Sequence, residues 1–270
     1  MKRIIFIAAL VSMTMAAQVF AGGGRDAGAV AGTIEVGGST SVVPAMELLM
    51  AAYTSSNPNA RINIHSTGSS DGIRNAGTLY QLGMTSRELT PAELGMGLNQ
   101  RLFAVDGVAV IVHQSSPVTN LTVAQIYGIY TGAITDWSQV SGAKSGPIAV
   151  VTREEGSGTR TAFEEIVGFP GRLRAGAVEG PSTGAVRSNV AGNPNAIGYI
   201  SIGSIDGTVR AINVNGVAPT AANMAAGTYG IARPFILLYR DLDAASRSFL
   251  NWIMGSEGQA IVERSWVRVN

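Results

Sequence analysis

The sequence predicts an α/β protein of two lobes, each built on a mostly parallel sheet flanked by helices. Short β-branched strands alternate with helical segments along the chain, and small-residue turns lead from strand to helix. This repetition is typical of parallel sheets, because a parallel pair needs a crossover connection. The chain has 270 residues, 46% of them hydrophobic, which is enough for one large core or two smaller ones. Two lobes are our interpretation.

The N-terminus has the composition of a secretory signal. Lys2 and Arg3 precede an apolar run, and small residues follow up to Ala21, so we expect cleavage of residues 1–21 and a flexible, glycine-rich N-terminus at 22–32. No later stretch offers the roughly 18 uninterrupted apolar residues that a membrane span requires. There is no cysteine, so the chain has no disulfide and no lipid-anchoring Cys. These features predict a periplasmic protein.

The charge balance excludes several partners. The chain has 19 basic and 18 acidic residues, so loss of Lys2 and Arg3 leaves a net charge of about −1. Such a chain has no bulk field to attract nucleic acid or anionic lipid. Two isolated histidines and no cysteine provide no zinc set, and we expect neither a metal nor a cofactor.

The first elements follow from periodicity. A strand begins at Thr33, and the next helix has apolar positions every three or four residues from Val43 to Tyr53, ending at Asn57-Pro58. Residues 60–66 alternate as a strand, a short helix starts at Gly72, and residues 80–84 form a third strand. Thr90-Pro91 opens another helical segment.

Two long β-branched runs, 103–113 and 233–240, are predicted to be buried strands that cross between the lobes. The residues after Arg240 have a helical period and should fold back on the first lobe. The first lobe is therefore predicted at 33–111 and 225–270, and the second at 112–224, with a cleft between them where a small ligand binds. Between the two runs we expect helices at 122–132 and 158–168, a turn at Trp137, and strands at 147–153 and 196–201.

The stretch VTREEGSGTR, residues 151–160, has the chemistry of an oxyanion site. The first N–H groups of a helix have no intrahelical partner and lie at the positive end of its dipole. Ser157 and Thr159 add hydroxyl donors, Gly158 allows close approach, and Arg153 supplies a guanidinium fork. The alternative for this stretch alone is an ordinary capped helix.

The same arrangement recurs after other strands. Thr40 and Ser41 follow the first strand, Ser69 follows the second, and Ser86-Arg87 follows the third. Small donors at four strand ends, divided between two lobes, are expected to converge on one cleft. None of these turns continues into Gly-Lys-Ser/Thr, which argues against a nucleotide-binding P-loop.

Six segments resemble those of a known family. They are VGGSTSVVPAMELL, STGSSDGI, LGMTSREL, VDGVAVIVH, LTVAQIYGIYTGAITDW and VVTREEGSGTRTAFEEIV. In this order they resemble the phosphate-binding subunit of the bacterial ABC phosphate importer, over most of the chain from Thr33 to Trp266. The resemblance implies a type II periplasmic-binding-protein fold that closes on inorganic phosphate and delivers it to a membrane permease, without catalysis. We also expect a monomer.

The resemblance also implies which residues contact the ligand. Matched position by position, they are Thr40, Ser41, Ser69, Ser86, Arg87, Arg153, Ser157, Gly158 and Thr159.

Monohydrogen phosphate carries a proton that needs an acceptor, and sulfate does not, so a carboxylate in the cleft would favour phosphate. Some family members have Asp at the position of Ser86. Asp106 is our first candidate for the acceptor in this chain and Asp71 the second. Either can instead be an ordinary turn residue, and Arg87 can instead pair with Glu88 or Glu93.

Two other functions remain open at this point. Another oxyanion, such as sulfate, molybdate or a phosphonate, would suit the same donors. A serine esterase is the second, because Gly68–Gly72 matches Gly-x-Ser-x-Gly around Ser70, with Asp106 and His113 following in order. Against it, Asp106 and His113 are close in sequence, whereas a triad takes its acid and histidine from separate loops.

Overall fold

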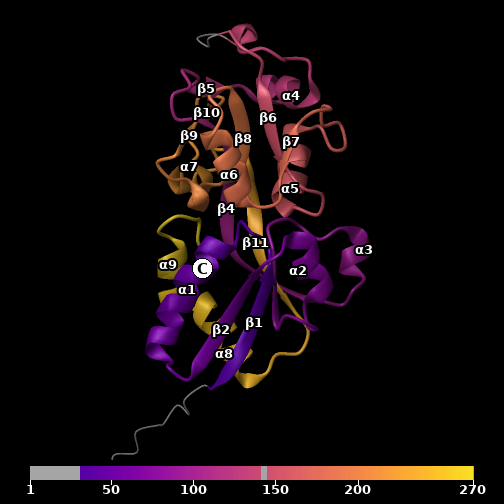
Figure 1. Cartoon of the computed structure of the whole chain (residues 1–270). Helices are drawn as coiled ribbons and strands as arrows, with labels where there is room; N and C mark the ends of the chain where they lie inside the picture. The colour runs from indigo at the N-terminus through magenta and orange to yellow at the C-terminus, as the bar shows by residue number, and fades with distance from the viewer. Residues whose placement is uncertain (1–30, 141–144, 270) are drawn as a thin grey trace, which may run out of the picture.

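The computed structural model describes residues 31–140 and 145–269 and shows an upper and a lower lobe connected by long strands (Figure 1). This mixed α/β architecture confirms the predicted fold class. The predicted signal peptide at 1–21 lies outside the described residues, as does nearly all of the predicted flexible terminus at 22–32.

The first lobe begins with a repeated strand–helix unit. Its elements are β1 (Gly32–Gly38), α1 (Val43–Ser56), β2 (Ala60–Ser66), α2 (Ser69–Asn75), β3 (Leu82–Thr85) and α3 (Pro91–Leu94). The strands pair in parallel in the order β2-β1-β3. In β2 the buried Ala60 and Ile62 alternate with exposed residues, and α1 ends where Asn57 donates to the carbonyl of Tyr53, just before Pro58.

Strand β4 (Asn99–His113) passes from one lobe to the other. Its residues up to Gly107 pair with β11 (Ala232–Tyr239), and from Val108 onward it pairs with β8 (Ala196–Ser201), in both cases antiparallel. The prediction that this strand crosses between lobes is therefore confirmed. Strand β11 lies between β3 and β4 and pairs with them only, so it begins next to the crossing point rather than passing through it.

The second lobe contains the middle of the chain. Its elements are β5 (Asn120–Leu121), α4 (Val123–Thr131), the 3-10 turn η1 (Trp137–Gln139), β6 (Ala149–Arg153), α5 (Gly158–Val167), β7 (Val178–Gly180), α6 (Thr183–Ala191), β8, the 3-10 turn η2 (Ile202–Ser204), β9 (Val209–Ala211), β10 (Asn213–Val214) and α7 (Ala221–Ala225). The sheet order is β4-β8-β6-β7, with β6 parallel to both neighbours. Its core includes an aromatic cluster in which Phe163 stacks on Tyr199 at 4.1 Å between ring centroids.

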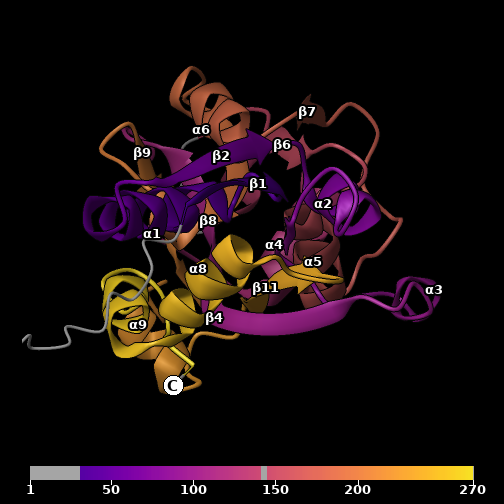
Figure 2. The same cartoon turned by 90° about the horizontal axis from the view of Figure 1, so that it is seen from below.

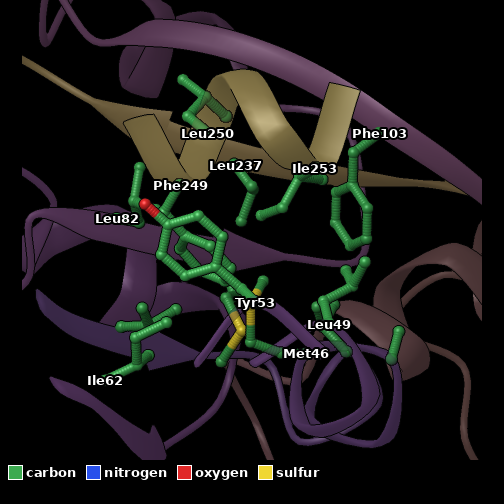
Figure 3. Close-up of a cluster of buried hydrophobic side chains, with 14 of the residues drawn as sticks. Met46, Leu49, Tyr53, Ile62, Leu82, Phe103, Leu237, Phe249, Leu250 and Ile253 are labelled. Atoms are coloured by element: carbon green, nitrogen blue, oxygen red, sulfur yellow. The ribbon is translucent and has the colours of Figure 1, made fainter. Parts of the chain in front are cut away.

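The C-terminal helices, α8 (Ala244–Met254) and α9 (Ser256–Val262), pack against α1, and α8 also contacts β1. Figure 3 shows that Phe249 and Ile253 of α8 face the side chains of α1 across a cluster of buried residues. Tyr53 of α1 meets the ring of Phe249 at 4.9 Å. Seen from below, β4 and β11 run side by side close to these helices (Figure 2), and Gln259 of α9 donates to the carbonyl of Phe103 on β4.

Over residues 31–140 and 145–269, the helices are all too short or too polar to cross a membrane.

Candidate functional site

Three corners of the first lobe bring serine and threonine side chains together. Ser39 follows β1, Ser69 begins α2, and Ser86 follows β3. The hydroxyl of Ser39 donates to Ser86 Oγ at 2.8 Å, and the amide of Ser86 donates to Ser69 Oγ at 3.2 Å. The first corner needs glycine, because Gly38 has a φ of 133° and a Cβ there would lie 2.2 Å from the carbonyl oxygen of Met84.

The second lobe contributes two helix starts and an arginine. Strand β6 ends at Arg153, and Ser157 caps α5 by accepting a hydrogen bond from the amide of Arg160. Helix α6 begins at Thr183, after the short strand β7. Both helix starts lie against the first lobe, because the amide of Thr183 donates to Thr40 Oγ1 at 3.2 Å and Gly158 lies close to Ser69.

The two lobes meet through these hydroxyl groups. Ser41 Oγ lies 2.7 Å from Thr159 Oγ1 and 3.0 Å from Thr183 Oγ1, and Thr40 Oγ1 lies 3.0 Å from Thr183 Oγ1. Gly158 of α5 approaches Ser69 so closely that a Cβ there would lie 2.3 Å from its Oγ. All of these side chains are buried, so the lobes are closed around a buried polar cluster.

Arg153 lies inside this cluster with 1% of its surface exposed. Its Nη1 donates to Thr159 and Thr183 at 3.4 and 3.3 Å, and its Nε and Nη2 hold the carboxylate of Glu154 at 2.8 and 2.7 Å. The backbone amide of Arg153 donates to the hydroxyl of Tyr199, where burial raises the pKa to about 12. The guanidinium is thus fixed with one edge toward Thr159 and Thr183 of the second lobe, whose hydroxyls in turn contact Ser41 of the first.

The cluster has the chemistry of a tetrahedral oxyanion site. It combines hydroxyl donors, helix-start amides and a buried guanidinium, and donors of this kind bind oxyanions strongly when water is excluded. The described residues include no group of three His, Cys, Asp or Glu side chains that could hold a metal ion.

The structure places both candidate proton acceptors away from the hydroxyls. Asp106 lies within β4 rather than in a turn. Its Oδ2 accepts a hydrogen bond from Arg233 Nη2 at 2.9 Å, and its Oδ1 accepts one from the hydroxyl of Ser201 at 2.7 Å. Asp71 accepts hydrogen bonds from Tyr80 and Asn75.

Arg87 forms a different contact from the one that the resemblance implies. Its two terminal nitrogens each donate to a carboxylate oxygen of Glu93 at 2.7 Å, which is the alternative left open by the sequence. Hydrogen bonds from Arg87, opposed by burial, lower the pKa of Glu93 to about 2. Arg87 reaches the edge of the site only through Ser70 Oγ at 3.4 Å.

The esterase triad is not assembled, and that hypothesis is wrong. The amide of Ser70 donates to the carbonyl of Gly156, and the hydroxyl oxygen of Ser70 accepts a hydrogen bond from Arg87 Nη2. His113 contacts Ser115 through Nδ1, and Asp106 is paired with Arg233. The proposed base and acid of the triad, His113 and Asp106, therefore contact other residues instead of Ser70.

Three residues of the cluster were missed by the sequence reasoning. Ser39 lies in the first corner beside the predicted Thr40, and Thr183 follows a Gly-Pro-Ser turn that is another strand-to-helix corner. Arg233, at the start of β11, donates to Ser86 Oγ at 3.3 Å. Thr183 could have been found from its turn, whereas nothing local to Arg233 distinguishes it.

A shallow pocket of about 320 Å³ lies beside the cluster, at the rim between the lobes. Its lining includes Gly68, Ser70 and Asp71 from the first lobe and Glu154, Glu155 and Gly156 from the second. The pocket is lined by three carboxylates, those of Asp71, Glu154 and Glu155, and by the guanidinium of Arg74.

Comparison with known proteins agrees with this geometry. A family model described as the PBP superfamily domain matches residues 23–257. A solved protein from Clostridium perfringens, described as a phosphate ABC transporter substrate-binding protein with bound phosphate, is 41% identical, with a TM-score of 0.86 over 88% of this chain and 100% of its own. An ABC-type phosphate transport receptor from Vibrio cholerae is 35% identical, with a TM-score of 0.71 over 88% and 100% of the two chains.

A curated relative extends the similarity. The phosphate-binding protein PstS of Borreliella burgdorferi is 28% identical over 244 residues, covering 85% of this chain and 87% of the relative. The chain therefore belongs to the PBP superfamily and, within it, to the family of phosphate ABC transporter substrate-binding proteins.

Proposed function

We propose that this protein captures inorganic phosphate between its two lobes and delivers it to the membrane permease of an ABC importer. The observation that carries the proposal is the contact of hydroxyl groups from both lobes around the buried guanidinium of Arg153. The relatives named above support phosphate over sulfate, molybdate or a phosphonate. The proposed ligand contacts are Thr40, Ser41, Ser69, Ser86, Arg153, Ser157, Gly158 and Thr159.

Closure of the lobes is the proposed binding step. Each lobe holds only part of the donor set, so phosphate binds the closed form better and shifts the population toward it. The oxygen of Ser157 accepts from Arg160, which leaves its proton for the ligand. Charge-assisted hydrogen bonds in a buried site support a Kd of micromolar order or lower. A micromolar Kd corresponds to a favourable binding free energy of about 8 kcal/mol.

The ligand proton requires a different acceptor from the two aspartates, because Asp106 and Asp71 are engaged elsewhere. We propose that a serine or threonine oxygen accepts it, since each hydroxyl is both donor and acceptor. Sulfate carries no such proton, so a competition between sulfate and phosphate measures how far the site selects its ligand by that proton.

The location and the boundaries of the lobes belong to the same proposal. We infer export by the signal at 1–21 to the periplasm, action as a monomer, and binding without turnover. The lobes are proposed at 33–111 with 225–270, and at 112–224. The change of partner of β4 between Gly107 and Val108 supports a boundary inside this strand.

Calorimetry on the mature chain tests the function. Phosphate should bind with a Kd of micromolar order or lower, and Arg153→Ala should abolish binding while the circular dichroism spectrum is retained. Arg187→Ala is the matched control, because Arg187 contacts Ser204 and Asp206 instead of the hydroxyl cluster. Phosphate affinity unchanged in Arg153→Ala, or sulfate or molybdate bound more tightly than phosphate by the wild type, would contradict the proposal.

A further inference from the structure

Arg233 and Asp106 form a buried ion pair beside the point where β4 crosses between the lobes. The two residues are 127 apart in sequence, and the register of β11 against β4 sets them side by side. Arg233 Nε and Nη2 lie 3.0 and 2.9 Å from Asp106 Oδ2, and the hydroxyl of Ser201 donates to Oδ1 at 2.7 Å. The exposed fractions are 3% for Arg233 and 0% for Asp106.

Stability alone does not explain this pair. Burial raises the pKa of Asp106 and lowers that of Arg233, and their mutual attraction opposes both shifts. Taking two charges out of water costs about as much as their attraction returns, so a buried pair is often replaceable by apolar residues without loss of stability. The third guanidinium nitrogen of Arg233, Nη1, does not contact Asp106, and its partner indicates a second role for the pair.

Nη1 of Arg233 reaches the hydroxyl cluster by donating to Ser86 Oγ at 3.3 Å. The hydroxyl of Ser39 donates to the same oxygen at 2.8 Å. A hydroxyl oxygen has two lone pairs, and these two donors occupy both. The proton of Ser86 must therefore be donated, and in this structure it lies toward Ser69 Oγ at 3.3 Å, on the side where Gly158 of the second lobe approaches.

We propose that Arg233, held by Asp106, is a positioning residue that makes the Ser86 hydroxyl a fixed hydrogen-bond donor to the oxyanion. The inference rests on the proposed function and specifies how one corner of that site recognises its ligand. Arg233 fixes the direction of the Ser86 proton, so this corner binds an oxygen that carries no proton of its own. The proton of monohydrogen phosphate must then lie toward another hydroxyl of the cluster.

A double-mutant cycle separates this role from a structural one. Because Arg233→Met alone would leave Asp106 buried and unpaired, it is combined with Asp106→Asn, which removes both charges and keeps an acceptor for Ser201. Ser86→Ala is made in the wild type and in this background. We expect the paired substitution and Ser86→Ala each to weaken phosphate binding about tenfold, and the triple variant to lose no more than about twofold beyond either.

Calorimetric titration with inorganic phosphate gives the four affinities, and thermal unfolding shows that each variant is folded. The same pair of substitutions at Arg187 and Asp206, whose side chains also form an ion pair, is the control and should leave affinity within about twofold. Two results would overturn the role of Arg233 without touching the proposed function: affinity losses that multiply in the triple variant, or a paired substitution at Arg233 and Asp106 that leaves phosphate affinity unchanged. A wild-type chain that binds no phosphate would refute the proposed function and this inference together.

Discussion

Gly158 offers the most direct test of lobe closure, because it lies in the first turn of α5 against the first lobe. A Cβ at this position would lie 2.3 Å from Ser69 Oγ and 2.9 Å from both Ser69 Cβ and Ser86 Oγ. Rotation of the Ser69 hydroxyl can relieve the first contact but not the contact with its Cβ. Gly158→Ala therefore forces the lobes apart without removing any hydrogen-bonding group.

The size of the effect follows from overpacking. Inserting a methyl group into a packed site costs about 1 to 3 kcal/mol, and each 1.4 kcal/mol is a factor of ten in affinity. The cost applies to the closed form alone, so phosphate affinity should fall roughly 5- to 150-fold. The open form should not be destabilised, because alanine suits a helix better than glycine does.

Titration calorimetry of Gly158→Ala with phosphate measures the loss, and thermal unfolding without phosphate checks the fold. Gly184→Ala is the matched control, since Gly184 occupies the first turn of α6 and its Cβ would come no closer than 3.8 Å to Ser182 Oγ. If Gly158→Ala bound phosphate within about twofold of the wild type, the closed contact between the lobes would not be the binding state.

Three further substitutions give separate predictions. Thr183→Val keeps the shape but removes the hydroxyl shared with Arg153 and the first lobe, and should weaken phosphate binding about 5- to 100-fold in calorimetry; unchanged affinity would exclude Thr183 from the site. Phe249→Ala should lower the free energy of unfolding by about 3 to 5 kcal/mol in a urea titration, because the ring is fully buried against α1; a loss below about 1 kcal/mol would contradict this packing. Arg87 depresses the folded-state pKa of Glu93 from 4.5 to about 2, so their pair stabilises the fold above pH 4.5 and this contribution is lost as pH falls toward 2. Arg87→Met should therefore reduce the stability difference between pH 6 and pH 3, and an undiminished difference would refute the assignment.

The elements that the sequence predicted well are those whose signals are local. The bounds of β2 and β8 agree with the predicted strands at 60–66 and 196–201, because alternation and flanking turns define both. The corners at Ser41 and Thr159 were likewise readable from small residues between a strand and a helix. Their contact across 118 residues could be expected only from a two-lobed fold, in which the corners of both lobes face one cleft.

The remaining features depend on register and on competition between partners. Arg233 meets Asp106 only because β11 pairs antiparallel with β4 in one register, and no local pattern encodes that. Thr183 follows β7, which at three residues is too short to show a strand period. For Arg87, the sequence left two glutamates within reach, and the turn at Thr90 brings Glu93 to both of its terminal nitrogens.

The sharing of β4 between the lobes also governs how the chain comes apart. A first lobe that kept β11 but lacked Asn99–Gly107 would lose the part of β4 that covers one edge of β11, and a second lobe that began at Val108 would cut β4 at the residue where its pairing with β8 starts. We expect neither lobe to fold alone, since each would expose an uncovered sheet edge. Because β4 belongs to both lobes, loss of structure in one lobe should weaken the other, and their unfolding should be coupled.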